Sequence, residues 1–483
     1  MKATVVSVLL LLLTVFAISQ NTTKSAYDDD PPDTSAEAAY SPQLRSELAA
    51  LRDAALGDEY AYRQLAHLTE NIGARPSGSA QAEAAANYVA DELRKLGLEV
   101  HLEEALVPHW VRGVETAELV EYPGQVPGTT QRIVLTALGG NAPTPPAGIT
   151  AEVIVVTSFD ELKTLGRDKV AGKIVLFNTR YDVRQALANY SFEAYEHAVL
   201  YRGKGAKEAA ALGAVGSLVR SVGDADFRLP HAGGSTAAGI PAGAVTAEDA
   251  DLIAYLAGQG RVRIHVTLTG QNQPPVIGHN VVADLKGSEH PEQIVVVSGH
   301  LDSWDLGTGA IDDACGVVIA METAELLQRL HLHPKRTLRV IAWTDEENGG
   351  KGHEAYAKDH AAEFANHVGA IESDSGAGHP LGFSAKISAG AFALLRPMQE
   401  ILAPVGANLM EPSNDSPGSD ISPLAKAGVP SFGMLPDGRT YFHYHHTAAD
   451  TLDKVAPQDV RENAAAMAVL AYTLASLPEP LPR

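Results

Sequence analysis

Residues 294–302 have the sequence Ile-Val-Val-Val-Ser-Gly-His-Leu-Asp. The opening apolar run predicts a strand that is buried on both faces, as strands of parallel sheets are. The run ends in Gly299, His300 and Asp302. Ligand sites in open α/β sheets lie at the carboxyl ends of the strands. The stretch therefore predicts both an α/β fold and the edge of the sheet at which a site would lie.

Strands and helices alternate on both sides of this run. The predicted elements are helices at 317–330 and about 353–364, and strands at 338–343, 368–372 and 429–435. Upstream, Ser79 is a plausible N-cap for a helix that ends at Gly97, and 98–106 is a predicted strand. This alternation predicts a three-layer α/β sandwich with a mostly parallel central sheet.

Residues 116–270 differ in character from the rest. Short Val- and Ile-rich runs at 153–156, 173–177 and 263–266 are separated by Gly and Pro, and one helix is predicted at 206–212. Clustered His, Asp or Glu residues with metal-ligand spacing do not occur there. We therefore interpret this zone as an inserted β-rich module without chemistry, between two parts of one domain at 41–115 and 271–483.

The N-terminus has the pattern of a secretory signal. Lys2 precedes an apolar run at 5–17, and a small-residue cleavage site places the predicted signal peptide at 1–19. The alternative, a membrane anchor, is disfavoured because the run is short for a membrane span. Residues 20–40 are rich in Ser, Thr, Asp and Pro and predict a flexible tether. The chain is therefore expected to be exported, periplasmic or secreted, with no transmembrane segment after cleavage.

Composition excludes several classes of protein. The 483 residues contain 37 Lys and Arg against 59 Asp and Glu, a formal net charge of −22. Such acidity disfavours nucleic acid as a partner. With 45% hydrophobic residues the chain is globular and not disordered. Cys315 is the only cysteine, so an intramolecular disulfide is excluded.

Each predicted strand of the C-terminal part is followed by acidic residues or histidines. The segments in question contain His300 and Asp302, Asp312 and Asp313, Asp345 to Glu347, Glu372 and Asp374, and His443, His445 and His446. Clustered carboxylates raise one another's pKa, and a bound divalent cation removes that cost. Mixed His and carboxylate ligands favour zinc, and two zinc ions could polarise a carbonyl and lower the pKa of a bridging water. From the residues alone, either Asp312 or Asp313 could bridge.

Taken together, these motifs resemble peptidase family M28, a family of di-zinc metallopeptidases, and within it the carboxypeptidase Q-like subgroup. The opening of the family's catalytic domain is similar to residues 68–79, and the subgroup's first metal motif is similar to 299–305. A protease-associated (PA) domain inserted in the catalytic domain resembles the middle zone at 170–176, 213–214 and 239–241. The resemblance implies a zinc exopeptidase fold with an inserted β-rich PA domain.

The resemblance also implies a role for each site residue. His300 and Asp374 would hold one zinc ion, Glu347 and His446 the other, and Asp312 would bridge both. The Asp302 carboxylate would orient the His300 imidazole and strengthen it as a ligand. Glu346 would be the general base that activates the metal-bridged water and then protonates the leaving amine.

Other residues are left with two interpretations. His445 could line a substrate pocket or be a surface histidine, and Trp304 and Tyr441 could pack or form pocket walls. Cys315 is interpreted as a packed small hydrophobe. Five further histidines are interpreted as ordinary ones without ligand partners: His67, His101, His109, His353 and His379.

We therefore predict an exported enzyme that binds two Zn²⁺ per chain and hydrolyses peptide bonds near a free terminus of short peptides. Two alternatives are a catalytically silent ectodomain of the same fold and a single-zinc acyl transferase of glutaminyl-cyclase type. The intact set of metal and catalytic residues disfavours both. The sequence leaves open whether the enzyme acts as an aminopeptidase, a carboxypeptidase or a dipeptidase, and the resemblance suggests a homodimer.

Overall fold

The computed structural model of the protein describes residues 39–223 and 227–483. The predicted signal peptide and most of the predicted tether lie outside the described residues. The end of the tether was placed too late, because Tyr40 is 3% exposed and belongs to the main core. Within the described residues, no helix is both long and apolar enough to cross a membrane.

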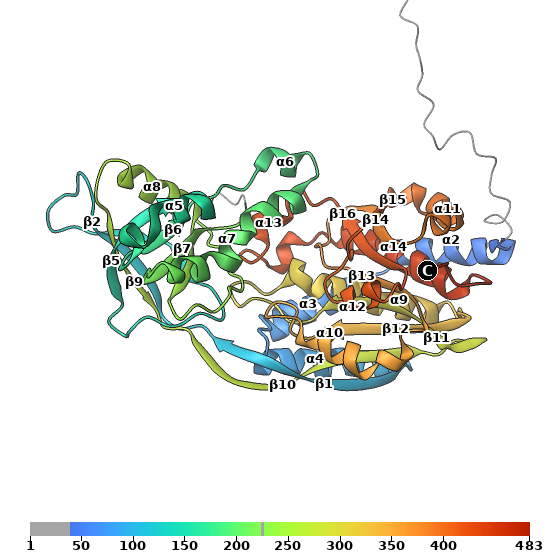
Figure 1. The fold of residues 1–483 in the computed structure, drawn as a ribbon. Coiled ribbons are helices and arrows are strands. Elements are labelled where there is room, and N and C mark those ends of the chain that lie inside the picture. The colour runs from blue at the N-terminus through green and yellow to red at the C-terminus, as the bar shows by residue number, and fades with distance from the viewer. Residues whose placement is uncertain (1–38, 224–226) are drawn as a thin grey trace, which may run out of the picture.

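The first sheet is built from both ends of the chain (Figure 1). Its strand order is β1-β10-β12-β11-β13-β16-β14-β15. The bounds are β1 Glu99–Val111, β10 Gln271–Leu285, β11 His290–His300, β12 Arg336–Trp343, β13 His367–Glu372, β14 Pro380–Lys386, β15 Leu409–Pro412 and β16 Ser431–Pro436. The inner strands β12, β11, β13 and β16 are parallel, but β1–β10, β10–β12 and β14–β16 are antiparallel. The sheet is therefore mixed, with a parallel centre.

Strand β11 is buried on both faces, as its apolar run predicts. Val295 and Val297 belong to the larger core, whereas Ile294 and Val296 belong to a second cluster on the opposite face. The larger core includes α2 (Pro42–Leu56), α3 (Tyr60–Ala66), α4 (Ala80–Lys95), α9 (Cys315–Arg329), α11 (Ala389–Leu402) and α14 (Pro457–Ser476). The second cluster includes α10 (Lys351–Asp359) and α12 (Ser422–Lys426). Helices on both faces give the sandwich three layers.

Local signals place several helix ends. Ser79 accepts a hydrogen bond from the Ala82 backbone N–H at the start of α4, and Gly97 adopts φ +86° just after its end. The predicted helix at 353–364 is α10 followed by a 3₁₀ turn at Ala361–Glu363.

A second sheet is formed by the chain between β1 and β10. Its order is β3-β2-β9-β5-β6-β7-β8-β4. The bounds are β2 Glu115–Glu121, β3 Gln131–Ile133, β4 Leu135–Ala137, β5 Ile149–Val156, β6 Ile174–Phe177, β7 Gly216–Arg220, β8 Ala242–Val245 and β9 Arg263–Leu268. Hereafter, "the inserted segment" means the described part of residues 116–270.

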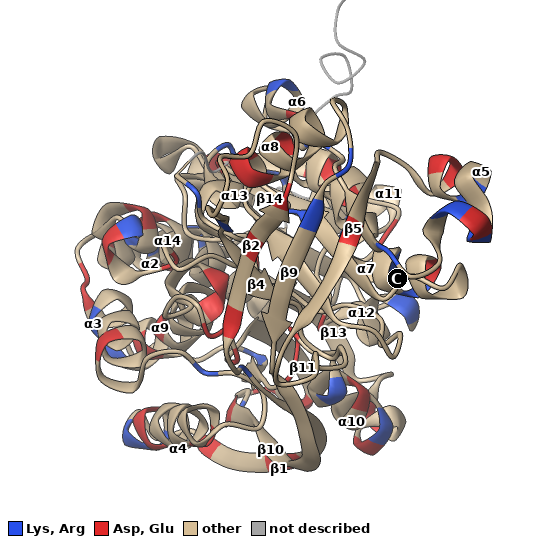
Figure 2. Cartoon of the chain, turned by 90° about the vertical axis from the view of Figure 1, so that its left-hand side faces the viewer, with Lys and Arg blue, Asp and Glu red and all other residues tan. Residues whose placement is uncertain are grey.

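The prediction of a single helix in this segment was wrong. It contains α5 (Phe159–Val170), α6 (Val183–Leu187), α7 (Ser191–Ala211) and α8 (Ala247–Ala257). Helix α7 begins 15 residues before the predicted start at 206 because its buried positions are small residues such as Ala194, Ala198 and Ala206, which give a weak hydrophobic pattern. Acidic and basic residues are spread over the helices around the second sheet, and α5 carries both signs (Figure 2).

Candidate metal centre

The predicted site residues meet at the carboxyl ends of the parallel strands. Strand β11 ends at His300, β12 leads into the turn with Glu346 and Glu347, and β13 is followed by Asp374. His446 follows β16 and the short helix α13 (Tyr441–Tyr444). This is the edge of the sheet that the sequence indicated.

Two glycines allow α9 to start against these strand ends. A Cβ atom on Gly299 would lie 2.6 Å from the backbone of Gly316 and Val317. A Cβ atom on Gly316 would lie 2.0 Å from the Ser373 carbonyl oxygen. Only glycine permits this approach, which brings the residues before α9 next to β11 and β13.

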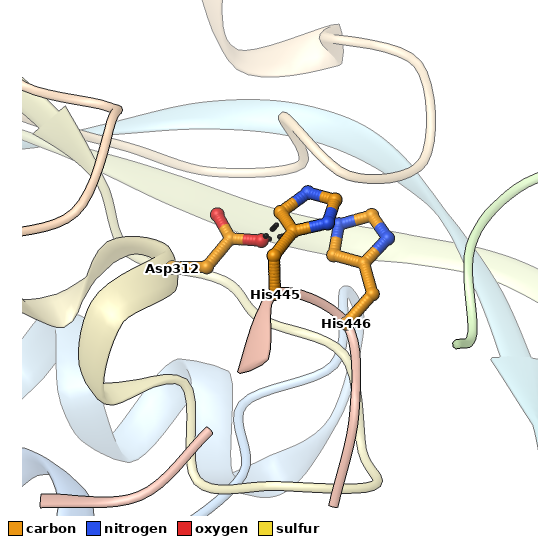
Figure 3. Close-up of side chains that lie close together, drawn as sticks. All are labelled: Asp312, His445 and His446. Carbon is orange, nitrogen blue, oxygen red and sulfur yellow. Dashed lines mark ion pairs between the residues drawn. The ribbon is translucent and has the colours of Figure 1, made fainter. Parts of the chain in front are cut away.

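Asp312 lies between two groups of side chains. Its Oδ1 is 3.1 Å from His300 Nε2, which is itself 3.3 Å from Asp374 Oδ1. Its Oδ2 is 3.1 Å from His446 Nε2, which is 3.0 Å from Glu347 Oε2. Figure 3 shows Asp312 facing His445 and His446, whose rings stack 3.6 Å apart. One carboxylate thus joins both groups.

Asp313, the alternative bridge, faces the backbone instead. Its Oδ2 accepts a hydrogen bond from the His300 N–H at 3.0 Å, and its Oδ1 accepts one from the Gly316 N–H at 3.1 Å. The geometry therefore favours Asp312 as the bridge.

Asp302 acts differently from what was expected. His300 Nδ1 lies 3.0 Å from the Asp302 backbone carbonyl oxygen but 3.9 Å from its carboxylate. The carboxylate instead accepts the backbone N–H groups of Glu346 at 3.0 Å and Glu347 at 3.3 Å. Asp302 therefore orients the imidazole through its main chain, and its side chain holds the turn that carries the two glutamates.

The donor set fits zinc. Two groups have ligand atoms within 4.8 Å of one another, His300 with Asp312 and Asp374, and Asp312 with His445 and His446. Glu347 Oε1 is buried without a hydrogen-bond partner. Imidazole and carboxylate donors together are a zinc ligand set, and a buried oxygen with no partner needs a cation or a donor.

Burial is the main influence on the pKa values here. It raises the pKa of Asp302 to about 7 and that of Asp374 to about 6. Burial alone would also raise the pKa of Asp312, but hydrogen bonds with His300 and His446 hold it well below its usual value. Burial lowers the pKa of His446, but Glu347 and Asp312 outweigh that effect and raise it to about 9. The cluster thus combines opposite charges in a buried site.

A cavity of about 310 Å³ opens beside these groups. The inserted segment contributes Phe192, Tyr195 and Arg202, all from α7, to its wall. Arg202 lies with its Nη1 3.2 Å from His446 Nδ1, and its guanidinium is 5.6 Å from the centre of the Tyr195 ring. The sequence analysis did not single out these three cavity-lining residues, and the expectation that this segment is without chemistry stays a prediction. The available signal was the spacing of Tyr195 and Arg202, two helical turns apart on one face.

No side chain of 116–270 belongs to the potential metal-holding groups found among the described residues.

The structure also shows where the residues lie that the sequence left with two interpretations. His445, Tyr441 and Trp304 are buried, at 7%, 7% and 6% exposure. His445 and Tyr441 line the 310 Å³ cavity, so the surface interpretation of His445 was wrong. Cys315 is fully buried, consistent with a packing role.

Three of the five further histidines have acidic partners. His101 Nε2 is 3.2 Å from Glu99 Oε1 on the same strand. His353 Nδ1 is 2.8 Å from Asp420 Oδ1. His379 lies with Asp459 and Glu462 in an exposed group whose ligand atoms are within reach of one another. The interpretation that none had ligand partners was therefore wrong for His379, whereas His101 and His353 belong to none of the potential metal-holding groups among the described residues.

Known proteins resemble the chain in sequence and in fold. Residues 280–471 match the model of peptidase family M28. Carboxypeptidase Q from Bos taurus is 40% identical over 428 residues, 87% of this chain and 86% of that protein. The crystal structure of a peptidase M28 precursor from Shewanella amazonensis has a TM-score of 0.86 at 33% identity, covering 91% of this chain and 98% of that one. The zinc aminopeptidase BSAP from Bacillus subtilis shares the fold, with a TM-score of 0.62 at 21% identity over 86% of this chain and 95% of that one.

Proposed function

The chain belongs to peptidase family M28 and is a zinc metallopeptidase, and from this premise we propose that it is an exported di-zinc exopeptidase that requires a free C-terminal carboxylate. The observation that carries the di-zinc assignment is the position of Asp312. Its two oxygens face His300 on one side and His446 on the other, at 3.1 Å each. In this proposal His300 and Asp374 hold one ion, Glu347 and His446 hold the other, and Asp312 is shared.

The bound zinc would polarise the scissile carbonyl and stabilise the negative charge that develops on its oxygen. Glu346 lines the same cavity as the ligands and is half-buried. It takes the proton of the attacking water and returns it to the leaving amine. The Asp302 carboxylate fixes Glu346 by accepting its backbone N–H.

Arg202 supports the choice of terminus. Carboxylates dominate the charged groups that line the 310 Å³ cavity, and Arg202 is the residue there with a permanent positive charge. Its Nε is buried without a hydrogen-bond partner. Arginine binds carboxylates through paired, charge-assisted hydrogen bonds. We assign it the substrate's terminal carboxylate, which makes the enzyme a carboxypeptidase or a dipeptidase, in keeping with the name of its relative carboxypeptidase Q.

A panel of four substrates tests this function. We expect hydrolysis of a free dipeptide and of its N-acetyl form if the enzyme is a carboxypeptidase, and of the free dipeptide alone if it is a dipeptidase. The C-terminal amide and an aminoacyl anilide should be poor substrates in both cases. Rapid cleavage of the anilide would establish an aminopeptidase instead, and no hydrolysis of any substrate by the zinc-loaded protein would favour the silent ectodomain.

An arginine variant tests the assigned residue. Arg202→Met keeps an unbranched apolar stem but removes the charge and the hydrogen-bond donors. It should lower kcat/KM for the free dipeptide roughly 10- to 100-fold, the loss of a hydrogen bond to a charged group. The amide should lose little. Arg184→Met is the control, because Arg184 is exposed on α6 and does not line the cavity. Equal losses on dipeptide and amide would refute the assignment.

Three further features belong to the proposal. The apolar run after Lys2 supports removal of 1–19 and export to the periplasm or the medium. The inserted segment is proposed to be a PA domain, with the catalytic domain at 41–115 and 271–483. A homodimer is proposed from the family resemblance, and light scattering of the purified chain tests it.

A further inference from the structure

The two proposed metal positions differ in the part of the chain that hydrogen-bonds their ligands, although α7 lines the cavity beside both. Around His300 and Asp374, the hydrogen bonds among the described residues come from the catalytic part of the chain. Asp313 and the Asp302 carbonyl contact His300, and Ser419 lies 3.4 Å from Asp374. Glu347 and His446 instead lie next to the inserted segment.

His446 is held by Ala232 of the inserted segment, 214 residues away along the chain. The Ala232 N–H donates to the His446 carbonyl oxygen at 2.7 Å. The Ala232 carbonyl oxygen lies 3.3 Å from His446 Nδ1. A proton placed on Nδ1 to make this bond leaves Nε2, which faces Asp312 and Glu347, free to bind a metal ion. Arg202 Nη1, 3.2 Å from the same Nδ1, then donates to the Ala232 carbonyl oxygen at 3.4 Å and not to the ring. The inserted segment thus fixes both the backbone and the ring of this histidine.

Glu347 is reached by the same segment through Trp304. The indole Nε1–H donates to Glu347 Oε2 at 2.6 Å. The far edge of the indole rests on Gly139, where a Cβ atom would lie 2.6 Å from Trp304 Cη2. The position of the indole therefore depends on a glycine of the inserted segment.

The parts of the inserted segment that support Glu347 and His446 are hydrogen-bonded to each other. The Gly139 N–H donates to the Gly233 carbonyl oxygen at 3.0 Å, and Gly139 pairs with Gly234 in an isolated β-bridge. Gly233 directly follows Ala232. The support of Glu347 and the support of His446 therefore form one small unit, residues 139 and 232–234, which we name the docking loop.

We propose that the docking loop completes one of the two metal positions, the one formed by Glu347 and His446, and that the position formed by His300 and Asp374 forms without it. Gly139, Ala232 and Trp304 are positioning residues in this scheme. The inference rests on the proposed di-zinc function.

Zinc binding by two variants tests the proposal. Gly139→Ala places a methyl group against the indole, and Trp304→Phe keeps an aromatic ring but removes the N–H donor. Each should retain one tightly bound zinc ion and bind the other roughly 10- to 100-fold more weakly, the usual effect of losing a partner that orients a ligand. The measurements are zinc content after dialysis and competition with a coloured chelator. Trp304→Phe keeps the test valid if Gly139→Ala does not fold.

Gly203→Ala is the matched control. Gly203 lies in α7 of the same segment, and its added Cβ would have nothing within 4 Å. It should bind two ions as the unchanged protein does. The double variant Trp304→Phe with Glu347→Gln should bind zinc no more weakly than Glu347→Gln alone, because Trp304 acts on the ion through the Glu347 carboxylate.

The outcomes separate the two proposals. An unchanged protein that binds only one zinc ion would overturn the proposed function itself. Two ions in the unchanged protein, with unaltered chelator competition in Gly139→Ala and Trp304→Phe, would overturn only the role of the docking loop. Equal weakening of both ions in these variants would also overturn it, because the proposal requires an asymmetric effect.

Discussion

Two adjacent glutamates in the turn after β12 have different surroundings. The Glu347 side chain is 5% exposed and contacts His446 and Trp304. Glu346 is half-buried and faces the cavity. Both backbone N–H groups are bound by the Asp302 carboxylate, so the turn aims one side chain at the metal ligands and the other at the space where substrate would lie.

Exchanging each glutamate for glutamine should separate base from ligand. Glu346→Gln keeps the shape but cannot take a proton, so kcat should fall roughly 10²- to 10⁴-fold while zinc content stays at two ions. Glu347→Gln should lower the affinity for one ion, and added zinc should partly restore its rate. Steady-state kinetics and metal analysis measure both. Near-normal turnover in zinc-replete Glu346→Gln would show that another carboxylate, Glu347 or Asp345, is the base.

At this scale the sequence indicated which residues gather but not which atoms meet. The strand-end rule brought the histidines and carboxylates to one edge, and the family resemblance, now confirmed, selected Asp312 over Asp313. It did not reveal that Asp302 uses its carbonyl for His300 and its carboxylate for the turn. The positions of residues along the chain indicate which side chains lie near one another. Which atom of a residue such as Asp302 makes a given contact depends on the conformation of its loop.

Helix α9 carries a buried acid that no metal position requires. Glu322 is 1% exposed, and its Oε2 accepts the Ala61 N–H at the start of α3 at 3.0 Å. Burial raises the pKa of Glu322 from 4.5 to about 8. Between these values the folded protein holds a proton that the unfolded chain releases, so this group lowers stability as the pH rises from about 4.5 to about 8.

Glu322→Gln should therefore stabilise the protein at high pH. The amide is neutral at every pH and still offers an oxygen to Ala61, so at pH 8 the variant should be more stable, by about 1–4 kcal/mol. At pH 5 the two proteins should unfold at nearly the same urea concentration, which provides the internal control. A variant that is less stable at pH 8 than the unchanged protein would show that the carboxylate form is preferred after all.

Among the elements, strands were easier to predict than helices of small residues. The run at 294–297 is buried on both faces, and that burial is why it is continuously apolar. In α7 the packing face consists of alanine and glycine because the helix lies close to β6, where Gly205 approaches Phe177 to within contact. Small residues leave little contrast between faces, so the sequence analysis missed most of this helix and Arg202, which lines the cavity.

At the scale of the molecule, the sequence predicted where the inserted segment begins and ends, but not that this segment contacts the candidate site. The change in composition near 116 and 270 marks the chain that forms the second sheet. The return of that chain to the site depends on pairs such as Ala232 and His446, which are 214 residues apart and follow no local pattern. Such contacts are set by how the two sheets pack.

Removal of zinc should affect the whole molecule as well as activity. The proposed ligands come from four separate segments, at 300–312, 347, 374 and 446. Without a cation, the negative charges of their clustered carboxylates repel one another. A ligand at 1,000 times its dissociation constant stabilises a folded protein by about 4 kcal/mol per site. Chelation followed by dialysis should therefore abolish hydrolysis and lower Tm by several degrees, and added zinc should restore both. Calorimetry of the apo and zinc-loaded protein measures the shift. Full activity in protein shown by metal analysis to be zinc-free would require a mechanism without metal. An unchanged Tm with lost activity would show that zinc does not bind the folded chain more tightly than the unfolded one.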